Sequence, residues 1–328
     1  MKAARVLWSN AVCAAPWAAV ALVLVVTTWV NHAVDLGSLS FDAFAAIPAS
    51  SITESGGDLL AVSKHLLARV AWGVPAIGFS LVAMAAMVTA IAVTVGGLRE
   101  MRGRERAMCA VGILLAALCF LVVVAYAGDR IMSEPEVTTN LRKATMHRTS
   151  ATHAVAADSL FDMASYLIFL LLLSAATATL LWPRGAAPTA AFLCRRLKRN
   201  RWLLYVGATT LVLRAIEMYT LYRWPGVWLS DEMAAAVDRM AMALSTTHGA
   251  FFSAILMALY LPTALITRLR IKLLATYAVD GTDQEPETWL AKEGLSTSPF
   301  QELARVFVTI APLIAGGSVA KLVEVLAG

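Results

Sequence analysis

The feature that most constrains this chain is the length of its uncharged stretches, with histidine counted as neutral. Five of them exceed the roughly 20 residues that a helix needs to cross a bilayer at 1.5 Å rise per residue. Apolar residues make up 59% of the chain and charged residues only 15%, which is too few to cover a soluble domain of this length. The stretches lie between Arg5 and Asp35, Arg69 and Arg99, Arg106 and Asp129, Asp162 and Arg184, and Arg239 and Arg268.

A sixth segment, 202–221, contains two charged residues but has aromatic residues at both of its ends, as membrane spans often do. Trp202 and Tyr205 lie at one end, and Tyr222 and Trp224 at the other. The predicted fold is therefore all-α, a polytopic transmembrane helical bundle of about six spans. The predicted spans are 12–34, 71–97, 107–127, 163–183, 202–221 and 246–267.

The loops between these spans predict the orientation of the chain. Lysine and arginine accumulate in the short loops 98–107 and 184–201, whereas the intervening loops 35–69, 128–162 and 222–245 are mixed or acidic. Cytoplasmic loops of membrane proteins carry this excess of basic residues. We therefore expect a multi-pass protein of the cell (inner) membrane with its amino terminus in the cytoplasm. The net charge of +5 has the same origin, and no nucleic-acid-binding motif accompanies it.

The carboxyl-terminal part is expected to differ from the transmembrane domain, which covers residues 1–278. Arg268, Arg270 and Lys272 follow the sixth span and place the next segment in the cytoplasm. Residues 279–300 are predicted to form a polar cytoplasmic linker, and 301–328 an amphipathic or apolar helix. An interfacial or re-entrant helix is the favoured interpretation, which leaves the carboxyl terminus cytoplasmic. A seventh span and a soluble helical hairpin are the alternatives.

Two outer loops are expected to contain helix as well. Residues 57–69 have helical apolar spacing and would extend the second span outward. Residues 137–162 contain neither glycine nor proline, so the fourth span can begin as a helix outside the membrane.

The strongest functional candidate is a polar stripe on the fifth predicted span. Gly207, Thr210, Arg214 and Glu217 share one helical face, and the last two are close enough to form an ion pair. A charge at this depth costs at least about 2.5–3.5 kcal/mol, so the stripe should face protein or water. It would line a solute path or a ligand pocket, or else form a structural pair that holds the helix against its neighbours.

Weaker candidates are expected at the outer face, where His32, Asp162 and His248 lie at the ends of spans. An enzyme acting on a lipid-linked substrate could use them. No nucleotide-binding, zinc-protease or serine-hydrolase motif is present in the sequence, so enzymatic activity is not favoured and no cofactor or metal site is predicted. Cys13, Cys109, Cys119 and Cys194 form no C-x-x-C pair, which argues against a disulfide framework.

The sequence gives no specific activity, and two functions remain open. The first is a transport- or channel-type protein that uses the polar stripe. The alternative is a non-enzymatic membrane subunit or sensor, which binds protein partners through its outer loops and carboxyl-terminal helix. The expected partners are the lipid bilayer, a second copy or another protein, and anionic lipid at Arg195, Arg196, Lys198 and Arg199.

Overall fold

The computed structural model describes residues 10–34, 59–131, 152–182, 189–280, 284–295 and 307–315. Within these ranges every regular element is a helix. Two 3₁₀ helices, η1 (Asn10–Ala14) and η4 (Trp224–Trp228), accompany the α-helices. The α-helices are α2 (Ala15–Val34), α4 (Leu59–Arg99), α5 (Gly103–Ile131), α7 (Thr152–Leu180), α8 (Ala190–Arg223), α9 (Asp231–Val279) and the short α10 (Pro286–Lys292), and residues 307–315 are also helical.

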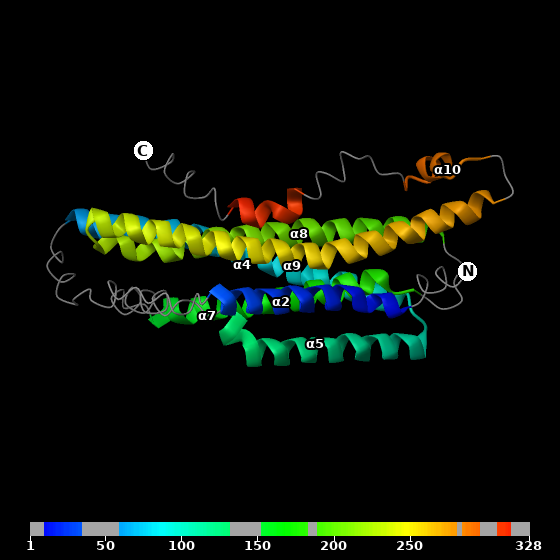
Figure 1. Ribbon diagram of the computed structural model, residues 1–328, viewed down its shortest axis with the longest axis horizontal. Helices are drawn as coiled ribbons and strands as arrows, with labels where there is room; N and C mark the ends of the chain where they lie inside the picture. Colours follow the sequence, from blue (N-terminus) through cyan, green and yellow to red (C-terminus); the bar gives the residue numbers. More distant parts are fainter. Residues whose placement is uncertain are drawn as a thin grey trace.

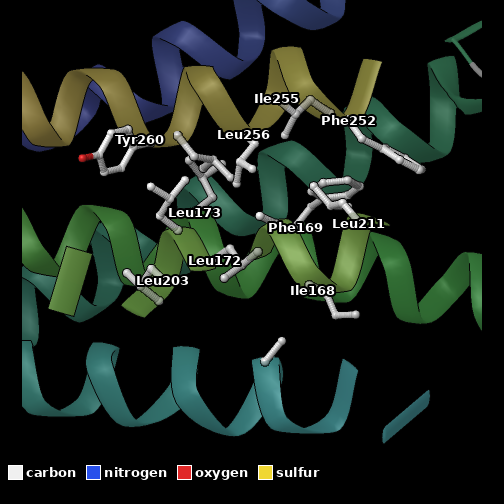
Figure 2. Packing of buried hydrophobic residues seen from close by; sticks show 14 of the residues in the cluster. Ile168, Phe169, Leu172, Leu173, Leu203, Leu211, Phe252, Ile255, Leu256 and Tyr260 are labelled. Atoms are coloured by element: carbon white, nitrogen blue, oxygen red, sulfur yellow. The ribbon is translucent and has the colours of Figure 1, made fainter. Parts of the chain in front are cut away.

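The six long helices run side by side along the long axis of the molecule (Figure 1). Helix α8 packs most extensively on α9 and α4, and α4 also packs on α7. The core is made of leucine, isoleucine, alanine and aromatic side chains from α2, α4, α7, α8 and α9. Figure 2 shows this packing, with Phe169, Leu173 and Leu256 among the labelled residues. The result is an all-α bundle, as the sequence predicts.

Four helices are long and apolar enough to cross a membrane, and they suggest a membrane location. They lie in α4 (Leu66–Arg99), α5 (Gly103–Val122), α7 (Met163–Leu180) and α9 (Asp231–Val279), and a shorter apolar helix covers Val12–Thr27. The outer surface of the bundle fits this location because large apolar side chains are exposed along its helices. Helix α8 is not among the four; it begins with a basic run and carries Arg214 and Glu217 farther along.

Two helices extend beyond their predicted spans into the outer segments for which the sequence also predicts helix. Helix α4 begins at Leu59 and α7 at Thr152, so both include turns that we assigned to the outer loops. The prediction of a loop over 184–201 is wrong for residues 190–201, which form the first three turns of α8. Thr189 caps this helix, and its side-chain oxygen accepts a hydrogen bond from the Phe192 backbone N–H at 3.3 Å. The predicted linker 279–300 likewise contains α10.

The end of the bundle that carries Arg99, Arg196 and Arg270 is called the basic end below. Helix ends that are distant in sequence meet there in one apolar cluster, which includes Cys13, Met101 and Leu181. Helix α10 packs beside it through Trp289 and Leu290. The opposite end, called the Trp72 end, contains Trp72, Leu221 and Trp224 in a second cluster.

The carboxyl-terminal helix at 307–315 lies against the middle of the bundle, beside α9 (Figure 1). The Leu313 backbone N–H donates a hydrogen bond to Ser253 Oγ at 3.1 Å. A Cβ atom added to Gly249 would lie 2.5 Å from the Pro312 carbonyl oxygen, so only glycine permits this approach. Residues 307–315 thus pack on α9, while the three interpretations of 301–328 stay predictions.

Candidate functional site: the buried polar face of α8

Helix α8 carries polar and charged residues along one buried face. Asn200, Gly207 and Arg214 recur every seven residues, and at 3.6 residues per turn they therefore lie on the same side of the helix. Arg196, Thr210 and Glu217 lie on or next to this face and are buried too. Between Arg196 and Glu217 the helix rises about 31 Å, close to the roughly 30 Å thickness of a hydrocarbon core. We call this the polar face of α8.

Arg214 and Glu217 form an ion pair through Arg214 Nη1 and Glu217 Oε2, as the sequence predicts. Their side chains are only 3% and 0% exposed. Trp72 of α4 donates a hydrogen bond from its indole N–H to Glu217 Oε1 at 2.8 Å, so both carboxylate oxygens are bonded. The Arg214 guanidinium lies 5.7 Å from the ring centre of Phe79, also on α4, within reach of a cation–π interaction. The pair therefore faces another helix rather than solvent or lipid.

The other two residues of the predicted stripe are enclosed by the protein as well. A Cβ atom on Gly207 would lie 3.2 Å from a methyl group of Leu256 and 3.3 Å from one of Leu172. Thr210 donates its hydroxyl to the Val206 carbonyl oxygen of its own helix at 2.8 Å. All four predicted residues thus lie on one buried face. Apolar side chains fill the space beside Gly207.

One turn nearer the basic end, the polar face borders a cavity between α7, α8 and α9. Its volume is about 20 Å³, and its walls include Asn200, Leu203 and Tyr260. The Asn200 side-chain carbonyl oxygen accepts a hydrogen bond from the Thr263 hydroxyl at 2.9 Å. Asn200 lies outside the predicted stripe because the sequence places the start of the fifth span at residue 202.

A cluster of charges closes the polar face at the basic end. Glu100 accepts hydrogen bonds from Arg196 at 2.5 Å and from Arg199 at 2.9 Å. Arg196 also donates to the Ala178 carbonyl oxygen, and Arg270 donates to that of Leu180 at 2.8 Å. Both carbonyls lie at the carboxyl-terminal end of α7. The last carbonyls of a helix have no partner within it and attract cations, so the two arginines cap α7.

The location of Arg196 corrects one predicted partner. Its side chain is 2% exposed and bound to Glu100, so it is not available to a lipid headgroup. Burial lowers the pKa of Arg196 to about 10, which leaves the guanidinium charged at neutral pH. Arg195 and Lys198 are exposed and Arg199 is partly exposed, so the prediction of anionic lipid remains open for these three.

Of the three outer-face candidates, only His248 has a described side chain. His248 Nδ1 lies 2.8 Å from the Leu244 carbonyl oxygen, and its ring makes tilted contacts with the rings of Tyr222 and Phe252. His32 and Asp162 belong to helices α2 and α7, but their side chains lie outside the described set. The proposed shared site therefore remains a prediction.

Several residues of the site have no signal in the sequence. Trp72 and Glu217 are 145 positions apart, and Glu100 and Arg199 are 99 apart, so no local pattern links them. Asn200 could have been found, because it continues the seven-residue spacing of Gly207 and Arg214.

All four cysteines have free thiols in the structure. Among the described residues, no group of three or more histidine, cysteine or acidic side chains is arranged to hold a metal ion. Comparisons with known protein families, with curated proteins and with solved structures found no match to this chain.

Proposed function

We propose that this chain is a multi-pass integral membrane protein that acts as a non-enzymatic subunit and binds another membrane protein. The membrane location is supported by the four long apolar helices and the apolar outer surface. The subunit role is supported by one observation above all. The charged pair that would have to line a transport path is enclosed between α8 and the aromatic residues of α4.

The proposed orientation has six spans, with both termini in the cytoplasm. The apolar cluster at the basic end supports it, because it joins residues of η1, α7 and α9 to the connection between α4 and α5. In a bundle that crosses the membrane back and forth, these ends belong on one side. Their excess of arginine favours the cytoplasmic side.

Helix α5 offers the surface for a partner. Only 6% of the most apolar stretch of α5 is buried inside the bundle, against 67% of the corresponding stretch of α7. It lies at the edge of the bundle, away from α8 and α9 (Figure 1). Leu114, Leu118 and Val122 are among its exposed side chains. The proposed occupant is an apolar transmembrane helix of a partner subunit, which would pack on α5 as helices pack within membranes.

The proposal is tested by purifying the full chain in mild detergent and identifying what remains bound at constant stoichiometry. Leu114 on α5 and Leu265 on α9 are each 59% exposed, so the first serves as the test site and the second as its control. We expect Leu114→Trp to reduce the bound partner severalfold and Leu265→Trp to leave it unchanged. Equal effects of the two variants, or a protein that purifies alone, would contradict the proposal.

A transport function is the second candidate, and the length of the polar face of α8 favours it. This face covers about the thickness of a hydrocarbon core and borders the cavity at Asn200. Transport would require a second conformation in which Arg214 and Glu217 separate from α4. Flux of a solute or of protons into liposomes that contain the pure chain, lost in Glu217→Gln at equal protein abundance, would support it over the subunit role.

A further inference from the structure

The cavity between α7, α8 and α9 lies in the interior of the bundle. Each residue that lines it is buried, and most are leucines. Figure 2 shows three of its walls, Leu172, Leu203 and Leu256, within the apolar core. Asn200 brings an amide into these surroundings, although its side chain is 3% exposed.

The Asn200 amide is only half satisfied by the protein. Its oxygen accepts from the Thr263 hydroxyl, while its nitrogen, Nδ2, is buried and has no hydrogen-bond partner among the described residues. Rotating the amide by 180° exchanges its oxygen and nitrogen, but one of the two still has no partner. Thr263 Oγ lies 2.8 Å from the Tyr260 carbonyl oxygen and can donate there while it accepts from the amide N–H. In either orientation, one polar end of the amide needs a partner that the described part of the chain does not supply.

A second polar group lies within one turn of the cavity. Pro262 has no N–H and cannot donate to the carbonyl of Ala258, four residues earlier in α9. That carbonyl therefore lacks its usual helical donor, next to Leu259 in the cavity wall.

We propose that the cavity binds one water molecule, hydrogen-bonded to the Asn200 amide. A water needs roughly 10–15 Å³ measured in this way, and the cavity has about 20 Å³, so one water fits and an organic solute does not. Water both donates and accepts, so it satisfies the amide in either orientation. A buried amide without a partner destabilises a fold, which gives this water a stabilising role. The bound water would lie between α7, α8 and α9, close to Pro262.

The direct test is an experimental structure of the full chain in lipid nanodiscs at about 2 Å resolution. We expect one density peak of water size within hydrogen-bond distance of the Asn200 side chain. A cavity without density, or an amide that bonds only to protein atoms, would overturn the proposal.

A mutant cycle tests the proposal in solution. Ala176 lines the cavity, so Ala176→Val fills it and would expel the water. We expect this substitution to lower the melting temperature when Asn200 is present. In an Asn200→Leu background no amide is left to hydrate, and the same substitution should have no effect or raise the melting temperature. Equal shifts in both backgrounds mean that the cavity is dry, and they refute the proposal.

Discussion

At the scale of single residues, the charges buried in α8 are bonded to partners within the protein. Glu217 bonds to Arg214 and Trp72, while Arg196 bonds to Glu100 and a carbonyl of α7. Such pairs are retained only when their geometry leaves few polar atoms unbonded, because removing charges from water is costly. Deleting one member of a buried ion pair is therefore more destabilising than replacing both members by apolar residues.

This asymmetry predicts the behaviour of variants of the pair. Arg214→Met alone leaves a buried carboxylate uncompensated and should lower the free energy of unfolding by about 3–5 kcal/mol. The double variant Arg214→Met with Glu217→Met should be more stable than either single variant, since only Trp72 loses a partner. Denaturation of the purified protein in mixed micelles measures all three. A double variant less stable than both single variants would contradict this prediction.

Two neighbouring glycines provide a second prediction at this scale. A Cβ atom on Gly97 would lie 2.8 Å from the Ala178 carbonyl oxygen, which is backbone and cannot move aside. On Gly96 the nearest atom is 3.4 Å away, at the flexible end of Arg199. Gly97→Ala should therefore cost about 1–3 kcal/mol. Gly96→Ala should be neutral or slightly stabilising, because alanine favours helix by about 1 kcal/mol over glycine. Thermal unfolding of the two variants side by side checks the difference, and equal shifts would contradict it.

At the scale of elements, the least apolar long helix takes part in the most extensive helix–helix packing. Helix α8 packs on both α4 and α9, although its sequence begins with a basic run. Two arginines of that run are bonded to Glu100, which follows α4, and one of them also bonds to a backbone carbonyl of α7.

The carboxyl-terminal helix provides the prediction for this scale. Gly249→Val should displace residues 307–315, because the added side chain would collide with the backbone at Pro312 and Leu313. Thr309 is 2% exposed. In a chain without its natural cysteines, Thr309→Cys should resist maleimide, and the added Gly249→Val should make it reactive.

A matched control for this experiment is Gly73→Val on α4, since nothing lies within 4 Å of a Cβ atom there. It should leave Thr309→Cys protected. If the control raises labelling as much as Gly249→Val does, the effect comes from general loosening and not from the contact with 307–315.

The sequence predicts the elements better than it predicts the contacts between them. The uncharged stretches reveal the apolar helices because lipid and core impose the same requirement on them, a long run of apolar residues. The sequence predicts a loop for the basic segment at 190–201 because isolated charged side chains are normally solvated. Its helical state depends on Glu100 and on the end of α7, and a single sequence does not show that these lie nearby. The Arg214–Glu217 pair is predictable because it is local, whereas Trp72 is not.

At the scale of the whole molecule, the proposed orientation can be tested without a structure. Reporter fusions after residues 100, 150, 190, 235 and 290 should alternate between cytoplasmic and external, beginning in the cytoplasm. The physical reason is the retention of arginine and lysine on the side where the chain is made. Two successive fusions on the same side would break the six-span order.

The length of α9 has a mechanical consequence. At 1.5 Å per residue, the unbroken helix from Asp231 to Val279 is about 73 Å long, more than twice the roughly 30 Å of a hydrocarbon core. A rigid tilt of α9 by about 5° about one end would move the other end by about 6 Å, so a displacement on one side of a bilayer would be transmitted mechanically to the far side.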